Sequence, residues 1–151
     1  MPKSVVKFDK DGVKYVSSVD KAQYTIYELS RAALRDVGKF VMRTFRKSYY
    51  QEFKRRTGRV GKNAQYWCKA NPKYQKNPEL EVGLKPGGFY GIFQEIGSSK
   101  QPKSALLKKS VEENIPEIIK IQSQYLSSLE DEAKALSLID EGDYQGGEGD
   151  D

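Results

Sequence analysis

Carboxylates come closest to a catalytic arrangement at two places in this sequence. Glu79 and Glu81 are two residues apart in a segment that alternates polar and apolar residues, so both project from one face of a strand. Glu52 and Lys54 form an acid-x-Lys pattern, which a metal-dependent nuclease could combine with a further carboxylate. The competing interpretation is the solvated face of a strand and an ordinary stretch of charged helix. We favour that interpretation because no third acid and no histidine accompany Glu79 and Glu81.

The residue inventory excludes several classes of chemistry. The 151 residues include no histidine and a single cysteine, Cys68. Ser-His-Asp and Cys-His catalysis and HExxH zinc sites all need histidine, and one cysteine makes neither an intrachain disulfide nor a multi-cysteine zinc site. The glycines between Gly83 and Gly97 match no phosphate-binding motif. We therefore expect no enzyme, no cofactor and no bound metal.

Charge is distributed unevenly along the chain. The formal net charge is +5, yet residues 130–151 hold nine acids and one lysine, whereas residues 39–76 hold twelve Lys or Arg and one acid. Such a density of positive charge attracts polyanions, although a basic helix face that simply stays solvated is an alternative. The candidate DNA-facing basic patch consists of Lys54, Arg55, Arg56, Arg59 and Lys62.

Apolar periodicity predicts the elements that position these residues. Three-and-four spacing over residues 20–56 predicts one long amphipathic helix. Before it, an Asp-Gly pair between two short apolar runs predicts a hairpin or arm within residues 1–19. Alternation over residues 64–70 and 79–84 predicts two half-buried strands. Residues 89–97 should form a short helix or an extended aromatic segment.

The C-terminal part carries a second apolar stripe and then an acidic tail. The stripe covers residues 104–136, and Pro116 within it predicts a kink or, alternatively, the start of a second helix. Residues 138–151 are rich in glycine and acids, which is typical of a disordered tail. We therefore expect a single α+β domain over residues 1–137. Its long N-terminal amphipathic helix and kinked C-terminal helix should pack on a small antiparallel sheet.

Location follows from what the sequence lacks. No apolar run approaches the roughly 18 residues of a membrane-spanning helix, so we expect no membrane contact. The first eight residues have no apolar core of a secretion signal, which favours the reducing cytoplasm.

Residues 89–107 resemble a signature of tailed-phage tail-completion proteins, also called head–tail joining or neck proteins. In that signature a Tyr precedes Glu-x-Gly-Ser/Thr, a short polar loop, Pro-Phe-Leu and a helix, and a Thr-Gly pair follows the long first helix. Ala105 and Leu106 depart from it where the family has Pro and Phe, and Arg59-Val60 stand where a Leu is expected. The residues that match are Thr57, Gly58, Tyr90, Glu95, Gly97, Ser98 and Leu107.

The resemblance implies a noncatalytic structural subunit of the virion. Such a subunit forms a ring on assembly, expected to be a hexamer, around the DNA channel. It contacts the head connector or stopper protein on one side and the tail tube or tail terminator protein on the other, with non-specific DNA contact. Before assembly it is in the host cytoplasm. The candidate docking loops contain Asn71, Lys73, Tyr74, Lys76, Ser99, Lys100 and Lys103.

A nucleic-acid-binding module remains the alternative function. In that interpretation the basic patch binds DNA in the free protein, and the acidic tail covers the patch and inhibits binding.

Overall fold

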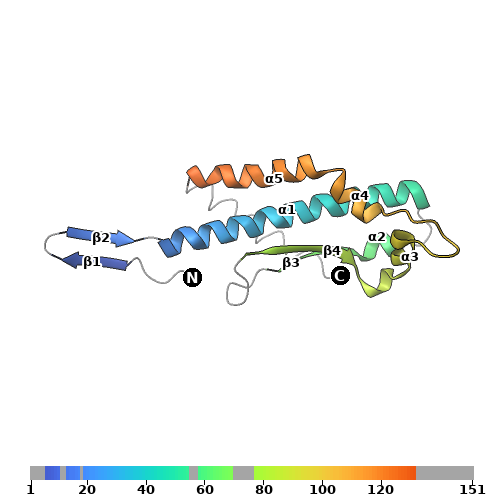
Figure 1. Cartoon of the computed structure of the whole chain (residues 1–151), viewed down its shortest axis with the longest axis horizontal. Coiled ribbons are helices and arrows are strands. Elements are labelled where there is room, and N and C mark those ends of the chain that lie inside the picture. The colour runs from blue at the N-terminus through green and yellow to red at the C-terminus, as the bar shows by residue number, and fades with distance from the viewer. Residues whose placement is uncertain (1–5, 11–12, 18, 55–57, 70–76, 132–151) are drawn as a thin grey trace.

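The computed structural model describes residues 6–10, 13–17, 19–54, 58–69 and 77–131. One long helix, α1 (Val19–Phe53), is the spine of the molecule (Figure 1). Its 35 residues span about 50 Å at the usual rise of an α-helix. At its N-terminal end, β1 (Val6–Lys10) and β2 (Val13–Ser17) form the expected antiparallel hairpin.

Two layers cover α1 from opposite sides. On one side α5 (Ile115–Ser127) runs back along it, and on the other lies the antiparallel pair of β3 (Ala64–Lys69) and β4 (Glu79–Leu84) (Figure 1). Between these two layers, buried apolar residues of α1 recur every four positions. Leu29, Ala33, Val37, Val41 and Phe45 are each at most 5% exposed.

Several short elements gather around the C-terminal end of α1. They are α2 (Arg59–Asn63), the 3-10 turn η1 (Pro86–Gly88), α3 (Tyr90–Ile96) and α4 (Leu106–Glu112). A final 3-10 turn, η2 (Ser128–Glu130), follows α5.

Arg46 fastens α2 and the start of β3 to α1. Its Nε donates a 2.8 Å hydrogen bond to the carbonyl of Gly61 in α2, and Nη2 donates one of 2.8 Å to the carbonyl of Ala64 at the start of β3. Val60 and Leu106, both 7% exposed, complete the core beside Phe45. Arg46, one of the twelve Lys and Arg of residues 39–76, therefore has a structural role.

The predicted α+β class, with its long N-terminal helix and small antiparallel sheet, is confirmed. The prediction that the C-terminal helix packs on the sheet is wrong, because α5 packs on α1, on the side opposite β3 and β4. The helix begins one residue earlier than predicted and ends at Phe53, because Lys54 turns into the left-handed region at φ +43°. Residues 89–97 contain a short helix, α3, which was one of the two alternatives. The sequence did not predict α2, since five residues are too few to show a helical period.

The predicted kink at Pro116 is a break between two helices. α4 ends at Glu112, and α5 begins at Ile115 with Pro116 in its first turn. There the missing proline N–H removes no helical hydrogen bond, so starting a new helix avoids the cost of proline in a helix interior. The second alternative is the correct one. The acidic tail lies outside the described residues.

Gly38 provides a test of how the sheet packs on α1. A Cβ there would lie 2.5 Å from Cδ2 and 2.6 Å from Cγ of Tyr66 on β3. Gly38→Ala should therefore lower the free energy of unfolding by about 1–3 kcal/mol, despite the gain of about 1 kcal/mol in helix propensity. Urea unfolding measures this, with the exposed Gln51→Ala in the same helix as control. A stabilised G38A variant would contradict the packing.

Candidate docking site around α3 and the α3–α4 loop

The segment that resembles the phage signature folds as helix, loop and helix, and Glu95 connects the two helices. Its Oε2 accepts a 3.0 Å hydrogen bond from the N–H of Leu107, and its Oε1 one of 2.9 Å from the N–H of Lys108. These N–H groups belong to the first turn of α4, where no helical carbonyl is available. Ala105, at the N-cap position, has no side chain that can accept them. Glu95 therefore caps α4 from the preceding helix, and its charge suits the helix dipole.

Gly97 is required by the turn that ends α3. Its φ is +90°, and its N–H donates a 2.9 Å hydrogen bond to the carbonyl of Phe93. A Cβ on Gly97 would lie 3.1 Å from the backbone nitrogen of Lys103. Both the dihedral angle and the close approach favour glycine. Ser98 then exchanges backbone hydrogen bonds of 2.8 and 3.2 Å with Gln101, so the loop is a tight turn.

The loop is anchored to α1 through Gln94. The carbonyl of Gln94 accepts hydrogen bonds from the N–H of Ser104, at 2.9 Å, and from its hydroxyl, at 2.8 Å. Its side-chain oxygen accepts a 2.7 Å hydrogen bond from the hydroxyl of Tyr49 in α1. Burial raises the pKa of Tyr49 above its ordinary value of 10.0, so this hydroxyl remains a donor at neutral pH. The exposed side chains of Ser99, Lys100 and Lys103 thus project from a fixed loop.

The apolar side chains of α3 face away from the core. Gly91 is the buried residue of this helix, and a Cβ there would lie 2.5 Å from Cδ1 of Leu84 and 2.9 Å from Cγ1 of Val60. The opposite face carries apolar residues at three-and-four spacing that normally mark a buried face. Together they form what we call the α3 patch. Its members are Phe89, Tyr90, Ile92, Phe93 and Ile96, which are 47–68% exposed.

Of the signature residues that the structure describes, all except Gly58 lie in α3, in the loop after it or at the start of α4. Glu95, Gly97 and Ser98 hold the loop, Tyr90 is in the α3 patch, and Leu107 packs against the core. Gly58 is outside this segment of the chain, directly before α2, with φ +70°. Thr57 is outside the described residues.

The other candidate docking loop is also outside the described residues. This applies to Asn71, Lys73, Tyr74 and Lys76.

The described part of the basic patch is at the C-terminal end of α1. Lys54 follows α1, and Arg59 and Lys62 are in α2; all three are exposed. Arg55 and Arg56 are outside the described residues.

The three glutamates considered for catalysis are not brought together. Glu52 is exposed in the last turn of α1. Glu81 forms an ion pair with Lys69 on β3. Glu79, the first residue of β4, lies opposite Lys69 in the register of the two strands. Within the described ranges, no cluster of three metal-ligating side chains occurs. The arrangement matches the solvated strand face of the competing interpretation.

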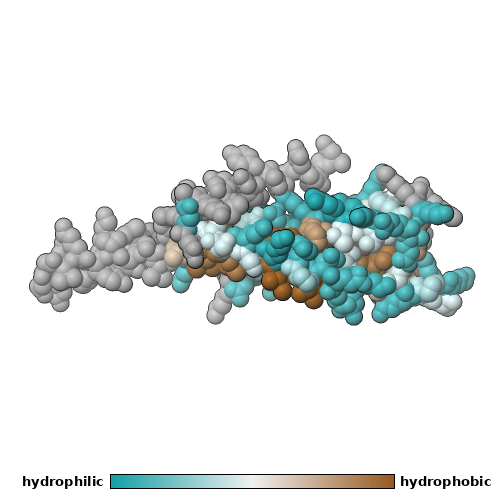
Figure 2. Space-filling model, turned by 90° about the horizontal axis from the view of Figure 1, so that it is seen from above, coloured by the Kyte–Doolittle hydropathy of each residue, from teal (hydrophilic) through white to brown (hydrophobic). Residues whose placement is uncertain are grey.

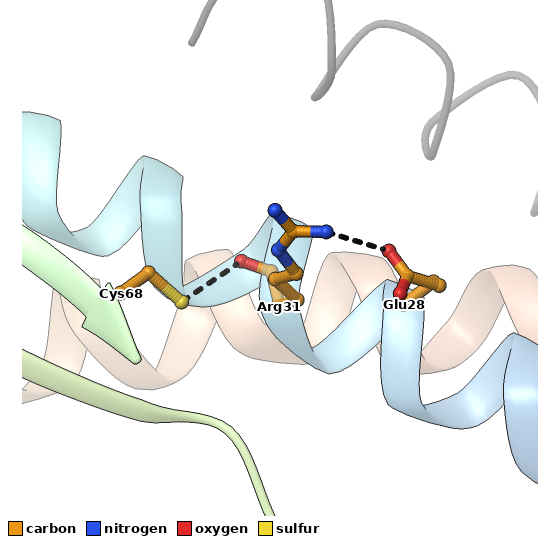
Figure 3. A network of polar contacts seen from close by, with 3 residues as sticks. All are labelled: Glu28, Arg31 and Cys68. Atoms are coloured by element: carbon orange, nitrogen blue, oxygen red, sulfur yellow. Dashed lines mark hydrogen bonds and ion pairs between the residues drawn. The ribbon is translucent and has the colours of Figure 1, made fainter. Parts of the chain in front are cut away.

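A polar cluster joins β3 to α1 farther along the spine (Figure 3). Glu28 is 9% exposed and pairs with Arg31 at 3.4 Å, while the thiol of Cys68 contacts the carbonyl of Arg31 at 3.9 Å. Burial raises the pKa of Cys68, and the guanidinium groups of Arg35 and Arg31 oppose this only in part. The thiol therefore stays protonated at neutral pH and lacks the activation of a nucleophile.

Comparison of the chain with protein-family models, with curated proteins and with solved structures found no match. In the part of the chain that the structure describes, no helix combines the length and apolar character needed to cross a bilayer.

Sequence reasoning missed the outward face of α3 and the anchor between Gln94 and Tyr49. The first had a signal, because Gly91 interrupts an otherwise apolar run and is the residue that faces inward. The second had none, since the two residues are 45 positions apart.

Glu95→Ala should destabilise the protein by about 1–2 kcal/mol, because it leaves two N–H groups of α4 without their acceptor. Urea unfolding measures the loss. Glu113→Ala, which removes an exposed acid just beyond α4, is the matched control and should change stability by less than about 0.5 kcal/mol. Equal effects of the two variants would show that Glu95 is not a cap.

Proposed function

We propose that this chain is a structural protein of a tailed-phage virion, a tail-completion or head–tail joining subunit. The observation that carries the proposal is the segment from Tyr90 to Leu107. Its signature-like Glu95 and Gly97 have defined roles, as the cap of α4 and as the positive-φ residue that ends α3. A signature with a structural reason for its Glu and Gly is better support than a match of letters alone.

The geometry also suits a protein that works by contact. Hydrogen bonds that Glu95 accepts and that Ser104 and Tyr49 donate hold the α3 patch and the loop after it, so a partner meets a preformed surface. Large aromatic and aliphatic side chains are the residues that anchor interfaces, and preformed surfaces lose less entropy on binding. We infer that this region docks onto a neighbouring subunit, the head connector or stopper protein, or the tail tube or tail terminator protein.

A ring around the DNA channel fits the asymmetry of the molecule. α3 and α4 lie at one end of α1, and the β1–β2 hairpin lies at the other (Figure 1). Unlike surfaces at two ends produce head-to-tail contacts, which close into a ring when the rotation between copies allows it. The proposed ring, a hexamer by family resemblance, would expose Lys54, Arg59 and Lys62 to non-specific contact with DNA.

Imaging of virions that carry a labelled copy of this chain tests the proposal. We expect the label at the joint between head and tail. Removal of the chain should leave normal heads and normal tails that do not join. Virions that assemble and infect without the chain, or a label elsewhere in the particle, would refute the proposal.

The DNA-binding alternative is favoured by one observation, the exposed cations of the basic patch at one end of α1. It predicts that the free protein binds DNA and that the triple variant K54A/R59A/K62A binds at least tenfold more weakly, with a salt dependence reduced by about one unit per residue. Fluorescence anisotropy at several salt concentrations measures both.

The matched control removes the same charge elsewhere. Lys108, Lys109 and Lys120 are exposed on α4 and α5, and K108A/K109A/K120A should bind DNA almost as the natural chain does. An equal loss in both triple variants would point to net charge instead of a site. Absence of binding at low salt, both by the natural chain and by a chain that lacks residues 138–151, would end this alternative.

A further inference from the structure

The α3 patch is an apolar surface with basic neighbours. Phe89, Ile92, Phe93 and Ile96 form its central stripe, and the two phenylalanine rings are 6.4 Å apart. Lysines stand on either side of the patch in the chain. These are Lys85 before it and Lys100 and Lys103 after it.

Glu95, the one acid within α3, accepts hydrogen bonds from N–H groups of α4. A single carboxylate offsets the positive charge of the three lysines only in part. On the face that Figure 2 shows, hydrophobic and hydrophilic residues also lie side by side on the described body. The complementary ligand is a segment that combines aliphatic or aromatic residues with acids.

We propose that the α3 patch binds the acidic C-terminal segment of a second copy of this chain. Residues 136–144 read Leu-Ser-Leu-Ile-Asp-Glu-Gly-Asp-Tyr, with three aliphatic residues and a tyrosine around three acids and no base. The aliphatic residues match the stripe of α3, and Asp140, Glu141 and Asp143 match the lysines beside it. The segment follows closely on Asp131, the last residue that the structure describes.

The length of α1 shows why a second copy is the occupant. The end of α5 lies beside Ala33, which lines a pocket with Tyr125 and Leu126, whereas α3 is bonded to Tyr49 through Gln94. Between Ala33 and Tyr49 the helix rises about 24 Å. The seven residues from Asp131 to Leu138 reach at most about 25 Å when fully extended.

In its own copy, Leu138 would therefore reach the patch only along a straight, fully extended path beside the helix, with no length left to pass around α4. A neighbouring copy meets no such limit. The end of α5, from which the chain continues toward this segment, also lies far from α3 (Figure 1).

The contact has a consequence for assembly. Patch and segment are different surfaces, so each copy can donate one and receive the other, and the association is head-to-tail. Five side chains cover much less area than a standard interface buries, so a single contact is weak and gains strength when several copies are held together. The proposed contact between copies does not depend on the phage function. Only its use in a virion ring rests on the function proposed above.

Complementation between two full-length variants tests the inference. The patch variant is I92S/I96S, which changes side chains that are 48% and 68% exposed and leaves the core intact. The segment variant is L138S/I139S. In sedimentation velocity the natural chain should associate with rising concentration, and each variant alone should associate at least tenfold more weakly.

An equimolar mixture should restore association and stop at the heterodimer, because the pair retains one intact patch and one intact segment. High salt should weaken this heterodimer.

The matched control is I115S/I119S on α5, where the two isoleucines are 47% and 55% exposed. It should associate as the natural chain does. The inference is wrong if the natural chain stays monomeric, if the segment variant associates normally, if the mixture fails to form the heterodimer, or if the control abolishes association. Any of these results would leave the virion location untouched, because the imaging experiment measures that location independently.

Discussion

The apolar stripe of α1 is the constraint on which the rest of the structure depends. A single helix has no interior, so residues such as Val41 and Phe45 reach 1–2% exposure only because other elements cover them. α5 covers the stripe from one side and β3 and β4 from the other. The small residue Gly38 lets the ring of Tyr66 approach the helix backbone. Packing on one spine gives a two-stranded sheet a support that it would lack in water by itself.

The same spine fixes the region that we propose for docking. Arg46 bonds α2 and the start of β3 to α1, and Tyr49 bonds α3 to it through Gln94. α3 approaches the body through Gly91, so its bulky apolar side chains point outward. The result is an apolar surface on a rigid frame. A preformed surface of this kind loses little conformational entropy if a partner binds to it.

Basic and acidic residues are concentrated in different parts of this chain. The described basic residues concentrate toward the C-terminal end of α1, and the acids of the sequence concentrate in its last 22 residues. A molecule with opposite charges on separate parts favours ordered contacts between copies and disfavours like-to-like contacts. Weak contacts of this type suit a component that must remain separate until neighbours hold several copies together.

The sequence by itself determined the elements whose signals are local. Apolar periodicity predicted α1, the β3–β4 pair and the α+β class, and the Glu95-x-Gly97 pattern marked the segment where the loop is held. Only the tertiary structure decided that Glu95 caps α4, that a new helix begins near Pro116, and that α3 turns its apolar face outward. Periodicity reports that a face is apolar, but not what covers it. Caps and exposure depend on contacts between residues far apart in the chain, and these exist only once α1 has gathered the other elements around it.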